Sequence, residues 1–416
     1  IGYTDVRRFV WENADYIMGR AVHALRSGVP AGPVDLESEA ELVASQAGPL
    51  VMVQLMKLLG PEAVVLLHDA VDELLDALDK FHGFARYTTG LLSVLTGVVQ
   101  VVAANDASIP QEHTIKPKPR LSREHRLRKL RAVLAGSTSD EAFDDPNLGE
   151  EASEIDVEPK EDEKEAKLAQ VVTEVMERAT PFVSHPSPYL RAQALQLLSQ
   201  GSIALASRGK FDKLMPVVNR AFPFMLARIG GRQSQVHQDE VDIAVQVEAL
   251  DLLATWAQTV PDFLSRRLNE EAWPRLRTLL SSLLPKSSQL DGKAGLKSIM
   301  KVQHNTRGSG RTFLLALTNA LANLVSGTKH RMASSAIWDI CTHPLLIFAL
   351  QTGVAPEVRA PVLSLFSELA KVNGGAVWAS VNAAGGCWSQ RQGGCLALDT
   401  KVDIVSSITE IFDGKA

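Results

Sequence analysis

The residue types that usually bind metal ions occur in this sequence, but their spacing does not complete a site. Cys341 lies two residues before His343, while Cys387 and Cys395 stand eight positions apart near the C-terminal end. A structural zinc site usually takes its cysteines in pairs separated by about two to four residues. We therefore interpret these cysteines as buried or loop thiols and predict no metal site.

Two histidines have neighbours of the types found in catalytic triads. His185 follows Ser184, and His237 lies two residues before Asp239. Both pairs sit in Pro- or Gln-rich turns, where polar residues commonly begin helices, and the sequence has no Gly-x-Ser-x-Gly nucleophile elbow. We predict no catalytic residues, no bound cofactor and no enzymatic activity.

A cluster of basic residues is a candidate binding face. Lys293, Lys297 and Lys301 recur every four residues, so they would share one face of a helix, and Arg307 and Arg311 follow. Such a face would hold an acidic protein partner, an inositol phosphate or the chain's own acidic segment. A solvated loop face is the simpler alternative for these residues. The turn at 308–311 is similar to a phosphate-binding turn but lacks the preceding strand and the lysine of a phosphate-binding loop, so we predict a flexible loop before a helix there.

Three hydroxyl side chains are candidate phosphorylation sites. Ser137, Thr138 and Ser153 each have a carboxylate three residues further on, which is the pattern accepted by acidophilic kinases of the casein-kinase-two type. Short motifs of this kind also occur by chance. Modification would add negative charge to a segment that is already acidic.

The composition indicates a long helical chain without a general affinity for nucleic acid or membranes. The 416 residues exceed the usual size of one hydrophobic core, so the chain must divide into domains or grow by stacking. Hydrophobic residues make up 45% and aromatic residues 6%, which suits a helical protein rich in Leu, Val and Ala. A net charge of −5 offers no global attraction to nucleic acid or acidic lipid.

Three cysteines are too few for a disulfide framework in a chain of this length, which favours the reducing cytoplasm and nucleus. The sequence begins without Met or a signal-peptide pattern, so we expect a fragment of a longer protein. The longest uncharged run, Tyr87–Asn105, is interrupted by polar residues. We predict a buried core helix there, not a membrane span.

One sequence motif recurs along the chain. RAQALQLLS (191–199) returns as RAPVLSLFS (359–367) and, in weaker form, as QVEALDLLA (246–254). Such repetition indicates an α-solenoid, in which each helix pair buries its apolar face against its neighbours. Arg191 and Arg359 are predicted to bond neighbouring helix ends through their planar guanidinium groups. The predicted core residues of the three copies are Leu195, Leu197, Leu198, Leu250, Leu253, Leu363 and Phe366.

The predicted fold is all-α, an α-solenoid of HEAT-like antiparallel helix pairs with a long charged disordered insertion. Residues 1–105 and 166–416 hold the repeats. The insertion, 106–165, has eight Lys and Arg against one acid from 116 to 131, and thirteen acids against two lysines from 139 to 165. Pro216 and Pro223 are predicted to kink or restart a helix at 213–229. Other helices or helix pairs are predicted at 13–26, 38–59, 62–82, 310–350, 356–372 and 398–413.

The chain resembles the C-terminal half of the Tel-two-interacting protein one family. The resemblance rests on YIMGRAVHAL (16–25), DALDKFH (76–82), the charged insertion, the RAQALQLLS helix with LMPVVNRAFPFMLARI (214–229), and VEALDLLATWAQTVPDFLSRRLNEEAWPRL (247–276). In the last segment, family members look similar at Asp262, Phe263, Leu264, Arg267 and Pro274. Residues 374–395 depart from the family pattern.

The resemblance implies a HEAT-repeat scaffold subunit of the Triple T co-chaperone complex. Its implied partners are the other two Triple T subunits, Hsp-ninety-linked chaperone machinery and the phosphatidylinositol-kinase-related protein kinases whose maturation and stability the complex supports. The alternative is an unrelated HEAT-repeat adaptor or transport receptor. A surplus of large apolar residues beyond about residue 310 predicts a partner surface containing Trp338, Leu345, Phe348 and Trp378.

Overall fold

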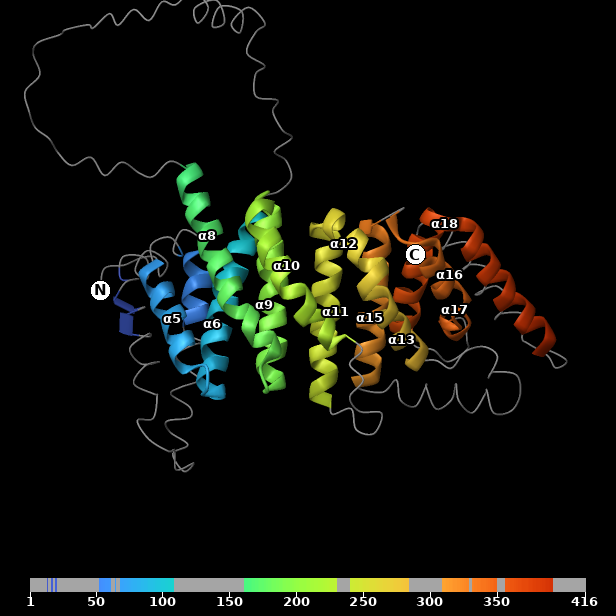
Figure 1. The fold of residues 1–416 in the computed structure, drawn as a ribbon, viewed down its shortest axis with the longest axis horizontal. Helices are drawn as coiled ribbons and strands as arrows, with labels where there is room; N and C mark the ends of the chain where they lie inside the picture. The colour runs from blue at the N-terminus through green and yellow to red at the C-terminus, as the bar shows by residue number, and fades with distance from the viewer. Residues whose placement is uncertain are drawn as a thin grey trace, which may run out of the picture.

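The computed structural model describes most of the helical part of the chain. Its ranges are residues 52–60, 68–107, 161–229, 240–283, 309–328, 331–349 and 356–391, with a few single positions among residues 13–20 and residue 64. Every long element in these ranges is helical, and none of these residues lies in a strand. The predicted all-α class is confirmed, and the helices stack along one long axis (Figure 1).

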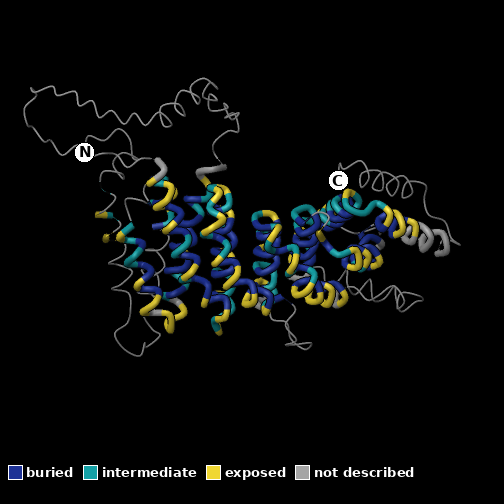
Figure 2. The backbone as a smooth tube through the Cα atoms, turned by 45° about the horizontal axis from the view of Figure 1, so that its top comes forward, coloured by how far each residue is buried: buried dark blue, intermediate teal, exposed yellow. Residues whose placement is uncertain are grey.

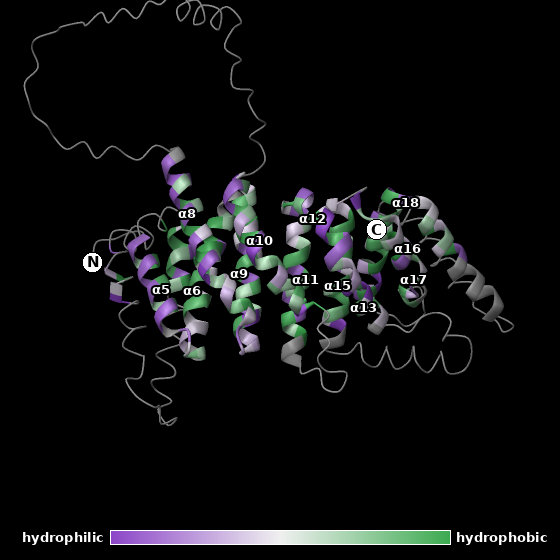
Figure 3. Ribbon diagram, viewed as in Figure 1, coloured by the Kyte–Doolittle hydropathy of each residue, from purple (hydrophilic) through white to green (hydrophobic). Residues whose placement is uncertain are grey.

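The first of two layers contains five of the described long helices, each packed against the next along the stack. Because neighbours cover these helices on two sides and the second layer covers a third, they carry apolar residues around much of their circumference (Figure 3). The layer consists of α6 (Ala85–Ala107), α9 (Pro188–Ser207), α11 (Glu240–Thr259), α15 (Ser309–Thr328) and the first part of α18 (Pro356–Arg391).

The second layer is made of shorter and more amphipathic elements. In α5, for example, Val71, Leu74 and Leu78 are buried while Asp76 and Asp79 face solvent, and Figure 2 shows the same alternation along the stack. This layer consists of α5 (His68–Phe81), α8 (Glu161–Ala179), the 3₁₀ turn η1 (Thr180–Ser184), α10 (Phe211–Arg228), α12 (Pro261–Arg267), the π-helical turn η2 (Leu268–Ala272), α13 (Trp273–Leu283), α16 (Ser334–Thr342) and α17 (Leu345–Ala349).

Helix α6 contains the long uncharged run of the sequence. By length and composition alone, Tyr87–Ala104 would be able to cross a membrane, and it is the one such helix among the described residues. In this structure it packs against α5, α8 and α9, and Leu91, Leu95, Val98 and Val102 are fully buried. Its packing matches the predicted core helix.

All three copies of the repeated motif lie in the first layer. They occupy α9, α11 and the first part of α18, and each predicted core residue of these copies is buried. Arg191 donates from Nη1 to the carbonyl oxygens of His185 (3.1 Å) and Pro186 (2.9 Å), and Arg359 donates from Nε to the carbonyl of Ala349 (3.1 Å). Both arginines therefore hold the start of a repeat helix to the end of the preceding element, as predicted.

The predicted insertion lies between two helices that pack together. Helix α6 ends at Ala107 and α8 begins at Glu161, so the last five residues assigned to the insertion are helical. This early start has a local cause, because residues 161–167 are good helix formers and Glu163 pairs with Lys167 at 3.2 Å, four residues apart. Residues 108–160 lie outside the described part of the chain.

The helix at 211–228 does not restart at its prolines. Helix α10 is continuous through Pro216 and Pro223, contrary to the predicted restart. Both prolines are exposed. The carbonyl groups one turn earlier, which lack a backbone N–H donor because proline has none, can therefore form hydrogen bonds with water. On the other side, Leu214, Val218 and Phe222 are buried and hold the helix against the core.

Helix α18 is two helices joined at a kink. Asn373 has non-helical backbone angles (φ −147°, ψ 80°), and its Oδ1 accepts the backbone N–H of Ala376 at 3.1 Å. This is an N-cap that starts a second helix. The predicted end at 372 is therefore confirmed, whereas the helical continuation to Arg391 was not predicted. The helix predicted at 398–413 lies outside the described residues, as do most of those at 13–26 and 38–59.

Candidate interaction surfaces

The segment α12–η2–α13 connects backward to α10. The guanidinium carbon of Arg267 lies 4.8 Å from the ring centre of Phe263 and 5.4 Å from that of Phe222. Arg267 also donates from Nη2 to Oδ1 of Asn219 at 2.8 Å, and Arg275 donates to the carbonyl oxygen of Leu226. The cation–π contacts and hydrogen bonds fix α12 and α13 on the side of α10.

The same segment connects forward to α16. Asp262 pairs with Arg331, while Asn269 donates to the carbonyl of Arg331 (3.1 Å) and accepts the backbone N–H of Ala333 (2.9 Å). In a separate contact, Asp339 on α16 accepts a hydrogen bond from Trp273 Nε1 (3.2 Å) and forms an ion pair with Arg277 Nη2 (3.1 Å).

Residues 261–277 thus form a polar junction between consecutive units of the second layer. The residues quoted for the family resemblance have structural roles here. Asp262, Phe263 and Arg267 make the contacts of the junction, Leu264 is buried, and Pro274 comes just after the π-helical turn η2, where the helical hydrogen-bond pattern is already altered.

First-layer helices meet mainly through uncharged groups. Between α9 and α11, Ser199 Oγ and Thr255 Oγ1 lie 2.9 Å apart, and Trp256 Nε1 donates to Ser202 Oγ at 2.9 Å. These pairs are 56 and 54 residues apart in the chain, which sets the length of one unit at this point of the stack. Between α11 and α15, Gly327 lies directly against the backbone carbonyl of Ala257, so the helices approach closely where no side chain intervenes.

The predicted partner surface divides into exposed and buried residues. Trp338 on α16 is 44% exposed and Trp378 on α18 is 55% exposed. Leu345 and Phe348 are buried, which corrects their assignment to this surface. Both belong to α17, a short helix that packs on α18 and fills the core at that end of the stack.

The predicted basic face is represented by one residue in the described part of the chain. Arg311, at the start of α15, forms an ion pair with Glu357 at the start of α18. Its charge therefore joins two first-layer helices. The remaining basic residues and the predicted phosphorylation sites lie outside the described residues; they are Lys293, Lys297, Lys301, Arg307, Ser137, Thr138 and Ser153.

Two of the residues considered for zinc binding or catalysis, Cys341 and His185, have other roles in the described part of the chain. Cys341 is buried, and burial raises the pKa of its thiol to about 12, so it stays protonated and is a poor nucleophile or ligand. His185 accepts the backbone N–H of Ser187 at 3.0 Å before α9, which is the predicted helix-start role. Cys395, His237 and Asp239 lie outside the described residues.

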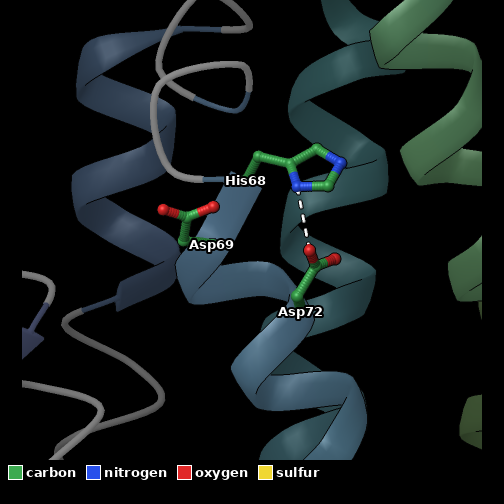
Figure 4. A group of neighbouring side chains, drawn as sticks. All are labelled: His68, Asp69 and Asp72. Atoms are coloured by element: carbon green, nitrogen blue, oxygen red, sulfur yellow. Dashed lines mark ion pairs between the residues drawn. The ribbon is translucent and has the colours of Figure 1, made fainter.

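A group of metal-ligand types that sequence reasoning missed begins α5. The ligand atoms of His68, Asp69 and Asp72 lie within 4.8 Å of one another, and His68 Nδ1 is 3.0 Å from Asp72 Oδ2 (Figure 4). The i, i+4 spacing of His68 and Asp72 was the available signal. The pair and the helix N-terminus, where carboxylates are stabilised, account for the arrangement without a cation.

Two carboxyl groups on α11 have altered acidity. Burial, and secondarily the neighbouring charge of Asp251, raise the pKa of Glu248 to about 7 from an ordinary value of 4.5. Burial also raises the pKa of Asp251. Neither carboxyl group has an ion pair with a described residue.

Comparison with known proteins identifies one family. A family model described as the TTI1 C-terminal TPR domain matches residues 105–378. Among solved structures, an engineered protein is similar at 13% sequence identity, with a TM-score of 0.27, over 95% of this chain and 98% of that chain. A TM-score this low says nothing about the fold or the function.

Proposed function

Because this chain belongs to the TTI1 family, we propose that it is a non-enzymatic helical-repeat scaffold of the Triple T co-chaperone complex. In this role it binds the other two subunits and Hsp-ninety-linked machinery in the cytoplasm and nucleus, and supports maturation of phosphatidylinositol-kinase-related protein kinases. Family membership also disfavours the alternative of an unrelated transport receptor.

The exposed tryptophans are the observation that supports a partner surface most directly. Trp256 and Trp273 are buried in the stack, whereas Trp338 and Trp378, both in the C-terminal units, remain about half exposed. Exposing a tryptophan to water is unfavourable, and tryptophan is enriched among the residues that dominate the energy of protein interfaces. We assign these two side chains to the contact with a sister subunit.

A co-purification experiment tests this proposal. The full chain and a truncation ending at residue 308, which removes α15 to α18, are expressed with both sister subunits. We expect the full chain to retain both subunits and the truncation to lose at least one, while circular dichroism shows that the remaining repeats keep their helices. If the truncation retains both subunits at the full chain's level, the contact lies upstream and the assignment fails.

A further inference from the structure

We infer that the solvent-facing side of α9 and α11 is a second docking surface, and that its partner is an amphipathic helix carrying basic residues. This α9–α11 face consists of Tyr189, Gln196 and Ile203 on α9, and of Glu248 and Asp251 on α11. This face lies on other helices than Trp338 and Trp378. The proposed scaffold role does not specify the chemistry of the partner that would bind here.

The two helices present these residues side by side. Tyr189, Gln196 and Ile203 recur every seven residues, so they share one face of α9. The hydrogen bond between Ser199 and Thr255 fixes the register, because Ser199 lies between Gln196 and Ile203 in the helix, and Thr255 lies one turn after Asp251 and two after Glu248.

The α9 side of the face is apolar at both ends. Tyr189 is 66% exposed and Ile203 is 40% exposed, and Gln196 between them is also exposed. A single exposed apolar residue is ordinary on a protein surface. Here, however, two such residues flank the position where the carboxyl groups of α11 lie.

The α11 side of the face is acidic. Glu248 is partly buried and Asp251 is exposed, and neither forms an ion pair within the described part of the chain. Burying a carboxylate without a cation is unfavourable, and the raised pKa of Glu248 reflects that penalty. A lysine or arginine of a partner would offset it, whereas an acidic peptide or an anionic lipid surface would be repelled.

The combination of apolar ends and an acidic centre selects one kind of partner. A helix with leucines at i and i+14, and with arginine or lysine about midway between them on the same side, would place its apolar side chains near Tyr189 and Ile203 and its cations near Glu248 and Asp251. Recognition would need both parts, because an exposed ion pair alone contributes little.

Fluorescence anisotropy with a synthetic helical peptide of about 18 residues tests this inference on the full chain. The peptide carries leucines and arginines on one face, and the control peptide has the same composition in scrambled order. We expect the amphipathic peptide to bind at least about tenfold more tightly than the control. The double substitution Glu248→Gln and Asp251→Asn should reduce the affinity for the amphipathic peptide about tenfold. Ile203→Ser should weaken binding by a similar factor.

Trp378→Ala separates this inference from the proposed function, because it should leave peptide binding unchanged even where it weakens binding of a sister subunit. The inference is overturned if both peptides bind equally, or if the double α11 variant binds the amphipathic peptide as the wild type does. Circular dichroism of each variant confirms that the helices remain folded.

Discussion

The two layers of this stack are held together by different chemistry. First-layer helices meet mainly through buried apolar side chains, close backbone approach at Gly327 and uncharged hydrogen bonds such as Ser199–Thr255, and an ion pair is added where α15 and α18 begin. Second-layer elements meet through guanidinium and carboxylate groups at partly exposed positions, as at Arg267 and Asp339. We infer that the first layer supplies most of the stability, while the second sets how consecutive units are oriented.

The largest expected effect comes from removing a first-layer side chain. Trp256→Ala empties a fully buried position and leaves Ser202 without its donor, so we expect the free energy of unfolding to fall by about 3–5 kcal/mol. Urea unfolding measures the change. Trp338→Ala is the matched control, since its side chain is half exposed, and it should change stability by much less. Similar losses for both substitutions would contradict the distinction between core and surface.

A smaller but still large effect is expected where two first-layer helices touch. Gly327→Ala would place a methyl group against the backbone carbonyl of Ala257, which cannot move aside like a flexible side chain. We expect a loss of roughly 1–3 kcal/mol, measured by thermal unfolding. Gly374→Ala is the control, because nothing lies near its Cβ position, and it should be close to neutral. If the two substitutions behave alike, the close approach of α11 and α15 is wrong.

Breaking the second layer should reduce stability less than breaking the first. Arg267→Ala removes one hydrogen bond to Asn219 and the stacking on Phe222 and Phe263, for which we expect about 1–2 kcal/mol. Arg267→Lys should not restore the loss, because lysine lacks the planar group that stacks and bonds at once. A loss as large as that of Trp256→Ala would show that the two layers contribute equally.

The smallest expected effect depends on pH. The pKa of Glu248 is raised from 4.5 to about 7 in the folded chain, so between these values the folded state holds a proton that the unfolded state releases. The stability contributed by this group is complete below pH 4.5 and is lost as the pH rises through about 7.

Glu248→Gln should therefore reduce the fall in stability between pH 5 and pH 8. Because the side chain is only partly buried, we expect a difference of roughly 1 kcal/mol or less. Urea unfolding of both proteins at the two pH values measures it. A fall of equal size in wild type and variant would assign the pH dependence to other groups.

Most of the first layer was predictable from the sequence. The recurrence of RAQALQLLS identified three first-layer helices, and the positions of Leu195, Leu250 and Phe366 within it identified core residues. This succeeded because one helix of each unit faces the same neighbours in every unit, so similar residues recur at similar positions.

The second layer was harder to predict because its contacts join residues far apart in the chain. Arg267 and Asn219 are 48 residues apart, and Trp273 and Asp339 are 66 apart, so no local pattern relates them. The same limit explains why Leu345 and Phe348 were wrongly assigned to a partner surface. Apolar composition shows that these side chains are buried by something, but whether a partner or α18 buries them depends on the tertiary fold.

The most direct test of the account is the affinity of the purified chain for its sister subunit when both exposed tryptophans are removed. Isothermal titration calorimetry would compare the wild type with the Trp338→Ala and Trp378→Ala double variant, using Phe211→Ala on α10 as an exposed aromatic control. We predict that the double variant loses about a hundredfold in affinity at an unchanged melting temperature, while the control binds as the wild type. Equal affinity of the double variant and the wild type would contradict the account.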